Sequence, residues 1–579
     1  MNDFETMKMN KIQKTFHFIR EYGWDFTFRR IKHKLGFKIS PETEYMIWAR
    51  RKKCTKTILE QQKAHKFAYM PEIAIIVDAV NATKEEKSVA KNAWKKQSYQ
   101  PSNLMMIEQY QDLDSVLKEI KQEVIVFTKV GLIPRDNYLF ACVKELNETR
   151  LNHYTKDENA SYKADMIYTD EDCITLDGKK LFKPFFKPDK SLELLCNFQY
   201  VGGMFAVKKS ALEQIDLTQA EIFGNGWYEL CFLCFEQIKN IGHIPEVLFS
   251  KVQQETDEFI RNKELTQKTF IENHLKRCNI NADVLESDVK GFYHVRYEIK
   301  GNPLVSIIIP SKDHTDDLDK CIKSLQQINT YKNIEIIIAE NNSTQDETFE
   351  YYAKIQKEDP RIKVVYWKKE FNYSAINNFA AEFAAGELLL FLNNDIEIIN
   401  PETITELVSY TYRQGCGAAG AMLYYEDNTI QHGGVVIGIG GFAANALWSL
   451  KDREEKYYPY SVTAREFTAC TAACLMVKRA TFQKIKGFDE YLCVALNDVD
   501  ICMRIRKEGE LLLFNPYATL YHYESKSRGL ENTPEKQERF NKEIAYFQEK
   551  WKSELELGDP YYNLNQTLHR ADYSMDYIV

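Results

Sequence analysis

The stretch Leu-Leu-Leu-Phe-Leu-Asn-Asn-Asp at residues 388–395 places five consecutive apolar side chains directly before two amides and a carboxylate. Such an apolar run is typical of a strand buried on both faces of a parallel sheet. Two further runs, Val305–Ile309 and Ile334–Ala339, also end in polar residues, and segments with helical spacing separate the runs. One helix is predicted to begin at a capping box of Thr344 and Glu347. This alternation predicts an α/β domain whose polar strand ends gather at one edge of the sheet.

The same pattern also occurs nearer the N-terminus. Ile73–Val77 matches Val305–Ile309, and later landmarks keep the same order, which indicates an internal repeat. The predicted fold class is therefore α/β, with two tandem, Rossmann-like mixed-sheet domains preceded by a basic helical arm. The predicted units are the basic and aromatic arm at 1–70, a first copy at 71–254, a connector at 255–302, a second copy at 303–530, and a C-terminal helix and tail at 531–579.

Composition excludes a disordered chain, because 44% of the 579 residues are apolar and can offset the entropy of ordering. Charge is unevenly distributed. Residues 1–70 hold 16 basic and 7 acidic side chains, a net charge of +9, and because the whole chain has a net charge of −8, residues 71–579 carry −17. The arm suits either an anionic membrane surface or packing on the protein body or a second subunit, so an oligomer is left open. The acidic remainder and the lack of a binding motif argue against a nucleic-acid partner.

No signal peptide is predicted, because residues 1–20 lack an apolar core. The uncharged stretch Asn428–Leu450 holds five glycines, which favours a loop or strand over a membrane span. We therefore expect a cytoplasmic protein, either free or peripheral at the inner face of the membrane. The 13 cysteines include one close pair, Cys231 and Cys234, without further ligands at zinc spacing, so we interpret them as reduced core thiols.

Several acidic residues follow predicted strands of the second copy. Asp395 at a strand end suits Mg²⁺ or Mn²⁺ bound with a diphosphate, although Asn-Asn-Asp alone also fits a turn. Asp498 and Asp500 open a predicted helix, where they could complement the helix dipole or serve as acid–base groups. The segment 521–529 adds a histidine that could complete a metal site and basic residues that could face phosphates: His522, Lys526 and Arg528.

Together these motifs resemble those of inverting family 2 glycosyltransferases of the GT-A fold, and they are most similar to bacterial rhamnosyltransferases. They lie at Ile307–Asp313, Ile336–Ser343, Phe371–Asn378, Phe391–Asp395, Gln431–Gly434, Cys474–Arg479, Gly487–Glu490, Asn497–Asp500 and His522. The resemblance implies that Asp498 is the general base, that Asp500 helps to position the acceptor, and that Asp395 and His522 bind Mn²⁺ or Mg²⁺. The residues implied in nucleotide-sugar binding are Pro310, Asp313, Glu340, Asn342, Asn377, Asn393, Asn394, Gly433, Gly434, Lys526 and Arg528.

The resemblance also implies a reaction: a sugar passes from a nucleotide sugar to a hydroxyl of a growing, lipid-linked bacterial surface polysaccharide. dTDP-rhamnose is the first expectation for the donor, and a UDP-sugar is the alternative. The rival interpretation is a catalytically silent protein in which both copies bind carbohydrate or partner enzymes. The surviving acidic residues of the second copy distinguish the two, because a silent protein does not need them.

The first copy lacks the residues that carry chemistry in the second. In register, Gly131 falls on Asp395, Trp227 on Asp498, and Lys251, or Ser250 with a one-residue gap, on His522. This loss predicts a degenerate, pseudo-glycosyltransferase domain. Its own acidic group, Asp170–Asp172, fits either a sugar-binding or residual catalytic site, or a structured hairpin with a solvated acidic turn.

Overall fold

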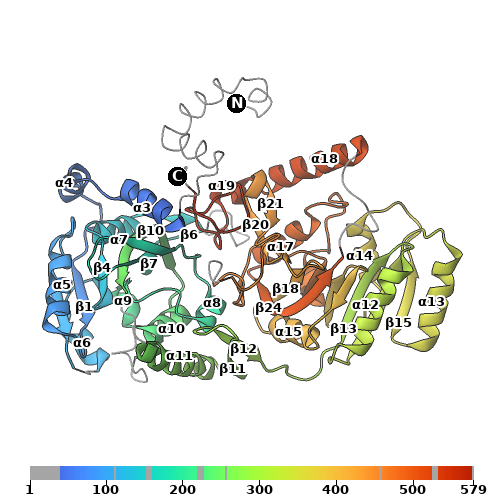
Figure 1. Ribbon diagram of the computed structural model, residues 1–579, viewed down its shortest axis with the longest axis horizontal. Helices are drawn as coiled ribbons and strands as arrows, with labels where there is room; N and C mark the ends of the chain where they lie inside the picture. The colour runs from blue at the N-terminus through green and yellow to red at the C-terminus, as the bar shows by residue number, and fades with distance from the viewer. Residues whose placement is uncertain are drawn as a thin grey trace.

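The computed structural model shows two α/β units side by side, one from each half of the chain (Figure 1). The structure describes residues 40–109, 112–151, 160–217, 227–253, 257–454, 459–523 and 533–576. Each unit is built on one large mixed sheet. The predicted fold class, α/β with two mixed-sheet domains, is therefore confirmed.

The first sheet has the strand order β2-β1-β3-β9-β7-β10-β4, with β8 paired to β7. β1 runs parallel to β2 and β3, whereas β9 is antiparallel to both of its neighbours. Its strands are β1 (Ile73–Asp78), β2 (Asn103–Ile107), β3 (Val124–Lys129), β4 (Leu132–Pro134), β7 (Met166–Ile174), β8 (Leu181–Phe185), β9 (Phe205–Lys208) and β10 (Ile241–Val252). A separate short hairpin joins β5 (Arg150–Leu151) to β6 (Ser161–Tyr162).

The second sheet has the order β15-β14-β13-β16-β23-β18-β24-β17, with β19 on β18 and β22 on β24. Its strands are β13 (Val305–Ser311), β14 (Ile334–Glu340), β15 (Ile362–Tyr366), β16 (Leu388–Leu392), β17 (Ile396–Ile398), β18 (Cys416–Tyr424), β19 (Ile430–His432), β22 (Arg465–Glu466), β23 (Cys474–Lys478) and β24 (Leu511–His522). Every residue of β16 is buried, as the apolar run predicts. The main path matches the first sheet strand for strand and direction for direction, with β15 as the one additional edge strand.

Helices pack against both sheets. In α12 the buried residues include Leu318, Cys321, Ile322 and Leu325, which is the predicted helical spacing. α13 begins at Asp346 with Gln345 as its N-cap residue, whereas the predicted capping box placed the cap at Thr344. The helices are α5 (Lys84–Lys95), α6 (Leu113–Glu119), α7 (Tyr138–Asn147), α8 (Leu192–Asn197), α9 (Lys209–Leu212), α10 (Tyr228–Gln237), α12 (Thr315–Gln327), α13 (Asp346–Glu358), α14 (Tyr373–Ala381), α15 (Thr403–Thr411), α16 (Arg479–Lys484) and α17 (Asn497–Lys507).

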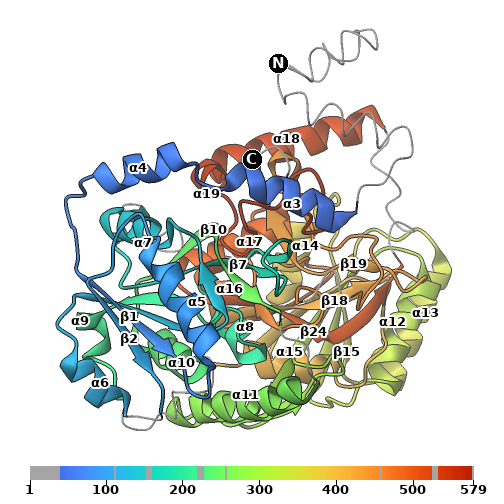
Figure 2. The same cartoon turned by 60° about the vertical axis from the view of Figure 1, so that its left-hand side comes forward.

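Three further segments lie outside the sheets. The described part of the arm forms α3 (Pro41–Lys52) and α4 (Lys56–Ala64). The connector forms α11 (Asp257–Arg277) and a hairpin of β11 (Ala282–Glu286) and β12 (Tyr293–Tyr297). The C-terminal segment forms α18 (Pro534–Lys550) and α19 (Lys552–Leu557), and Figure 2 shows α18 and α3 on the same side of the molecule, opposite α11.

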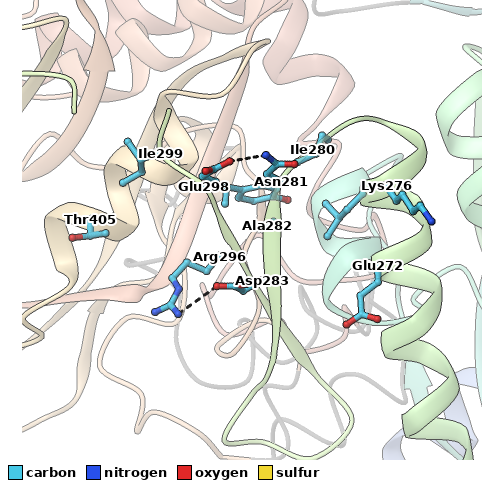
Figure 3. Close-up of a pocket in the computed structure, with 12 residues that line it drawn as sticks. Glu272, Lys276, Ile280, Asn281, Ala282, Asp283, Arg296, Glu298, Ile299 and Thr405 are labelled. Carbon is cyan, nitrogen blue, oxygen red and sulfur yellow. Dashed lines mark hydrogen bonds and ion pairs between the residues drawn. The ribbon is translucent and has the colours of Figure 1, made fainter. Parts of the chain in front are cut away.

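The two units share one hydrophobic core. A single cluster of buried side chains contains Met166 of the first sheet, Val295 of the connector hairpin and Ile307 of the second sheet. Beside this junction lies a cavity of about 740 Å³, lined by α11, the hairpin and Thr405 of α15 (Figure 3). None of the predicted site residues lines it. The cavity therefore belongs to the junction between the units.

The Gly-rich stretch Asn428–Leu450 contains β19, β20 (Val435–Ile437), a short 3₁₀ helix (Ile439–Gly441) and β21 (Ala443–Asn445). Among the described residues, no helix combines the length and the apolar composition that crossing a membrane requires. All 13 cysteines are free thiols, and Cys231 and Cys234 are both buried.

Candidate active site

Asp395 and Asn393 follow the carboxyl end of β16, as predicted. The backbone N–H of Asn393 donates to the carbonyl oxygen of Ala473 at 3.0 Å, and the carbonyl oxygen of Asp395 accepts from the N–H of Tyr523 at 2.9 Å. These two bonds attach the loop to β23 on one side and to the end of β24 on the other. The Asp395 residue is 6% exposed, so its carboxylate is held in a buried, fixed position.

His522, the last residue of β24, faces this loop. Its Nε2 atom lies 3.1 Å from Oδ1 of Asp395 and 3.2 Å from Nδ2 of Asn393. Its Nδ1 atom lies 2.5 Å from Oε1 of Gln431. Oxygen ligands with one imidazole suit a divalent cation such as Mn²⁺. A carboxylate oxygen and an imidazole nitrogen 3.1 Å apart can share a hydrogen or can both bind one cation, so these residues fit the predicted metal.

Asp498 lies in the first turn of α17 and is partly buried. Its carboxylate accepts from the N–H of Val499 at 2.9 Å and from the N–H of Ala472 at 3.3 Å. Burial raises the pKa of Asp498, and hydrogen bonds from the Thr471 side chain and the two backbone N–H groups offset part of that rise. A carboxylate with a raised pKa is a stronger base than an ordinary one, which suits it to accept a proton.

Tyr373, at the start of α14, links the two acidic positions. Its hydroxyl donates to the carbonyl oxygen of Ala472 at 2.9 Å. Burial raises the pKa of Tyr373, and the charges of both Asp498 and Asp395 raise it further. Both carboxylates therefore lie within electrostatic range of one hydroxyl group. Because Ala473 holds the Asn393 loop and Ala472 holds Asp498, the backbone at 471–473 stands between the two acids.

Asp500 is fully buried and already has three partners. Its carboxylate accepts from Arg504 at 2.7 Å and from the Trp551 indole at 3.0 Å, and it forms an ion pair with Lys550 at 2.7 Å. These contacts attach α18 and the residue after it to α17. With these three partners, Asp500 supports the helix that carries Asp498; its predicted role in positioning the acceptor stays a prediction.

The predicted donor-binding residues at the ends of β13 and β14 mostly bond to the protein itself. Asp313 accepts from the N–H groups of Thr344 and Gln345 at 3.0 and 3.2 Å, so it holds the loop that leads into α13. The predicted capping box is not formed, because the N-cap residue of α13 is Gln345 and it makes no side-chain cap hydrogen bond. Burial raises the pKa of Asp313, but the bonds from Thr344 and Gln345 outweigh it and lower the pKa overall. Glu340 accepts from the N–H of Ser343 at 2.5 Å. Asn342 donates to the backbone, and Pro310 lies within β13 opposite Ala339.

The remaining predicted residues fall into three groups. Asn377 is fully buried in α14 and donates to the carbonyl oxygen of Tyr373, and Asn394 is buried beside Asp395. Gly433 and Gly434 pass close under other groups: Gly434 has φ 98°, and a Cβ there would overlap the ring of Phe467. This close packing and the positive φ explain the glycine at 434, whereas a Cβ at Gly433 would lie 3.1 Å from Cδ1 of Leu447. Lys526 and Arg528 lie outside the described residues.

Sequence reasoning did not assign roles to four residues that hold the site together: Gln431, His432, Thr471 and Tyr373. The Nδ1–H group of His432 donates to Oδ1 of Asn445 at 2.8 Å, and its Nε2 atom accepts from the N–H of Thr471 at 3.4 Å. Burial lowers the pKa of His432 to about 4, so its ring is neutral at pH 7. Three of these residues lie within the Gln431–Gly434 and Phe371–Asn378 motifs, which could have pointed to them. Thr471 lies outside all of the motifs.

The first sheet lacks the metal-ligand candidates at the matching positions. The β4–β10 ladder pairs Leu132 with Lys251, as the β17–β24 ladder pairs Ile396 with His522. The residue before each short strand accepts a matching hydrogen bond: the carbonyl oxygen of Gly131 accepts from the N–H of Val252, and that of Asp395 accepts from the N–H of Tyr523, both at 2.9 Å. The matched residues are therefore Lys251 and His522, and Gly131 and Asp395. This register agrees with the ungapped sequence comparison.

An ammonium group stands where the second sheet has its metal-ligand candidates. Lys251 forms an ion pair with Glu171, which also pairs with the fully buried Lys187 at 2.9 Å. Burial raises the pKa of Glu171, but the two lysines outweigh it and bring the pKa down to about 2. Trp227 donates to the carbonyl oxygen of Thr128 and is the N-cap residue of α10 with φ 65°, as Leu496 is the N-cap residue of α17 with φ 61°. Counted from these helix starts, Glu229 takes the position of Asp498, so the predicted match of Trp227 with Asp498 is wrong. The Glu229 carboxylate forms an ion pair with Arg277.

Asp170–Asp172 form part of the buried strand β7, so the prediction of a solvated acidic turn is wrong. Asp170 accepts from the Asn563 side chain at 2.9 Å, from the N–H of Lys187 at 2.8 Å, and contacts Nε2 of His243 at 2.9 Å. Asp172 accepts from Tyr45 of α3 at 2.6 Å and pairs with Arg135. These acids anchor the arm and the C-terminal tail, which leaves them engaged within the protein.

A second group of metal-ligand types occurs in the first unit. Among the described residues, Glu236, His274 and Cys278 bring ligand atoms within 4.8 Å of one another. Arg277 donates to both carboxylate oxygens of Glu236, at 2.8 and 3.2 Å, and so takes the place that a cation would need. We therefore interpret this group as an internal ion-pair cluster.

Comparison with known proteins agrees with this geometry. Residues 306–485 match the family described as Glycosyl transferase family 2. They include β13 to β23 and therefore Asp395, but end before Asp498 and His522. This match covers the part of the second unit that contains Asp395, and it agrees with the predicted glycosyltransferase class.

Three relatives place the chain more closely. It is 34% identical over 419 residues to the uncharacterized protein y4gI of Sinorhizobium fredii, and 36% identical over 413 residues to the O-antigen biosynthesis protein RfbC of Myxococcus xanthus. These matches cover 71% and 70% of this chain but 46% and 32% of those proteins, so the chain spans less than half of their length. An N-acetylglucosaminyl-diphospho-decaprenol L-rhamnosyltransferase of Mycobacterium tuberculosis is 25% identical over 249 residues, covering 39% of this chain and 77% of that protein.

Proposed function

We propose that this chain is an inverting, metal-dependent glycosyltransferase with one active site, located in the second unit. The observation that carries the proposal is the arrangement of the two acids around the backbone at 471–473. Asp498 is held on one side by Ala472, and the Asp395 loop is held on the other by Ala473. The proposed base and the proposed cation ligand are thus both attached to one short backbone segment, which supports a single site for the two.

The residues of the chain divide the chemistry between them. Asp498 would take the proton of the acceptor hydroxyl as that oxygen attacks the anomeric carbon, and its backbone hydrogen bonds keep the carboxylate oriented. Asp395 and His522 would hold a divalent cation, with Asn393 beside them. That cation, when bound, neutralises the negative charge that grows on the departing diphosphate. The single imidazole among oxygen ligands favours Mn²⁺ over Mg²⁺.

For the substrates we propose dTDP-rhamnose as the donor and a lipid-linked glycan of a surface polysaccharide as the acceptor, with a UDP-sugar as the alternative donor. The names of the relatives support this choice, since one acts in O-antigen biosynthesis and another transfers L-rhamnose to a diphospho-decaprenol-linked sugar. Such an acceptor would place the reaction at the cytoplasmic face of the membrane. The described end of the arm supports that location, because Arg50, Arg51, Lys52 and Lys53 are all exposed.

For the first unit we propose a pseudo-glycosyltransferase role. Lys251 and Gly131 stand in the register positions of the metal ligands, and Glu171 is neutralised by lysines. Its strand-end acids instead hold α3 and the C-terminal tail. The unit therefore serves as a packing partner for the catalytic unit.

Nucleoside diphosphate release tests the proposal. The full chain is incubated with Mn²⁺ and either dTDP-rhamnose or a UDP-sugar, with and without a polyprenyl-diphosphate-linked acceptor. We expect release that depends on one donor, on the acceptor and on the metal, and that stops when EDTA removes the metal. Donor or acceptor binding without any turnover would support the silent, carbohydrate-binding alternative instead.

A further inference from the structure

Gln431 occupies an irregular position in its strand. Within the β18–β19 ladder, His432 pairs with Leu423 and Ile430 pairs with the next residue, Tyr424. Gln431 is therefore the extra residue of a bulge, and bulges redirect a side chain beside functional sites. It is 3% exposed, and its amide reaches the end of β24, where His522 lies.

The Gln431 amide makes two contacts with His522. Its Oε1 atom lies 2.5 Å from Nδ1 of the ring, and its Nε2 atom donates to the backbone carbonyl oxygen of His522 at 3.4 Å. The second contact settles the orientation of the amide, because a carbonyl oxygen can only accept. With the amide held this way, Oε1 must accept a hydrogen from Nδ1.

We propose that Gln431 is a positioning residue that makes His522 a metal ligand; this inference rests on the metal-dependent function proposed above. A neutral imidazole with its hydrogen on Nδ1 has its lone pair on Nε2. That nitrogen faces Asp395 and Asn393 at 3.1 and 3.2 Å. If the opposite amide orientation or no acceptor stood at 431, the hydrogen could move to Nε2 and block the ligand position.

Metal binding to the free protein tests this without relying on turnover. Mn²⁺ is titrated into the full chain with no donor or acceptor, and the unbound ion is followed by electron paramagnetic resonance. Gln431→Met keeps the length of the side chain but removes the acceptor, and we expect its Mn²⁺ affinity to fall about 10- to 100-fold, as for other partners that orient a metal-bound histidine. Gln431→Glu keeps an acceptor for Nδ1–H, and we expect it to retain Mn²⁺ affinity within about threefold of the parent.

Two further variants keep the outcome unambiguous. Gln548→Met is the matched control, because Gln548 is exposed and donates to Gly441 instead of a site residue; its affinity should equal that of the parent. Unchanged Mn²⁺ binding in a folded Gln431→Met, alongside loss of binding in His522→Ala, would overturn the inference and leave the proposed function standing. Unchanged binding in both His522→Ala and Asp395→Ala would overturn the metal site itself.

Discussion

The two units share a strand order and strand directions, yet they differ at nearly every strand end that matters for chemistry. In the second unit the β16 loop and the end of β24 bring together Asp395, Asn393 and His522. In the first, the matching positions hold Gly131 and Lys251. A sheet of this kind needs only its apolar runs to form, so a few strand-end residues can be exchanged without loss of the fold. Function therefore has to be inferred from those residues, and the fold alone does not decide it.

The largest expected effect separates the two units at the proposed base. Asp498→Asn removes the proton acceptor, and we expect the rate of transfer to fall about 10²- to 10⁴-fold while nucleotide binding is kept. Glu229→Gln changes the equivalent helix position of the first unit, whose carboxylate is already paired with Arg277, and transfer should stay within about twofold. Steady-state kinetics and donor binding measure both. Equal losses in the two variants would show that the first unit takes part in catalysis.

The second prediction concerns the acids of the first unit, which the structure assigns to folding. Asp170→Ala leaves His243, Asn563 and the N–H of Lys187 without their buried partner, and the free energy of unfolding should fall by about 3–5 kcal/mol. Chemical denaturation measures this loss. The exposed Asp283, paired with Arg296 at 3.7 Å, is the matched control, and its alanine variant should lose less than about 1 kcal/mol. A stable Asp170→Ala protein with altered sugar binding would instead favour a binding site there.

The third prediction locates the cation. Asp395→Ala should weaken Mn²⁺ binding at least about tenfold, because it removes a charged ligand. Lys251→Met, at the position equivalent to His522, should leave Mn²⁺ affinity unchanged. Calorimetric titration of each variant gives the comparison. Mn²⁺ binding that depends on Lys251 and not on Asp395 would reverse the assignment of the active unit.

The smallest expected effect is a shift in pH dependence. Asp498 must be ionised to accept a proton, so activity should fall as the pH decreases through its raised pKa. The Thr471 hydroxyl stabilises the ionised form and lowers that pKa. Thr471→Val should therefore move the acid limb of kcat/KM to higher pH by about one unit, and Thr471→Ser should restore it. A limb that stays in place in Thr471→Val would mean that another group titrates.

Sequence reasoning predicted the strands correctly but not all of the contacts that the polar residues make. The apolar runs placed β13, β14 and β16 correctly because such runs are local. Thr344 was expected to cap α13, but the N–H of Thr344 instead donates to Asp313, 31 residues earlier in the chain. The predicted nucleotide contact of Asp313 stays a prediction. A long-range bond of this kind depends on how two loops meet, which no local pattern encodes.

The sequence by itself determined the two-fold repetition, the α/β architecture and which copy retains Asp395, Asp498 and His522, because apolar runs and residue identities are properties of the chain alone. Only the tertiary structure decided that Asp500 is paired with Arg504 and Lys550. It also decided that the C-terminal tail bonds to Asp170 and that Gln431 bonds to the ring of His522. The reason is physical. A polar side chain acts through the partners that folding brings to it, and here those partners come from as far as 395 residues away.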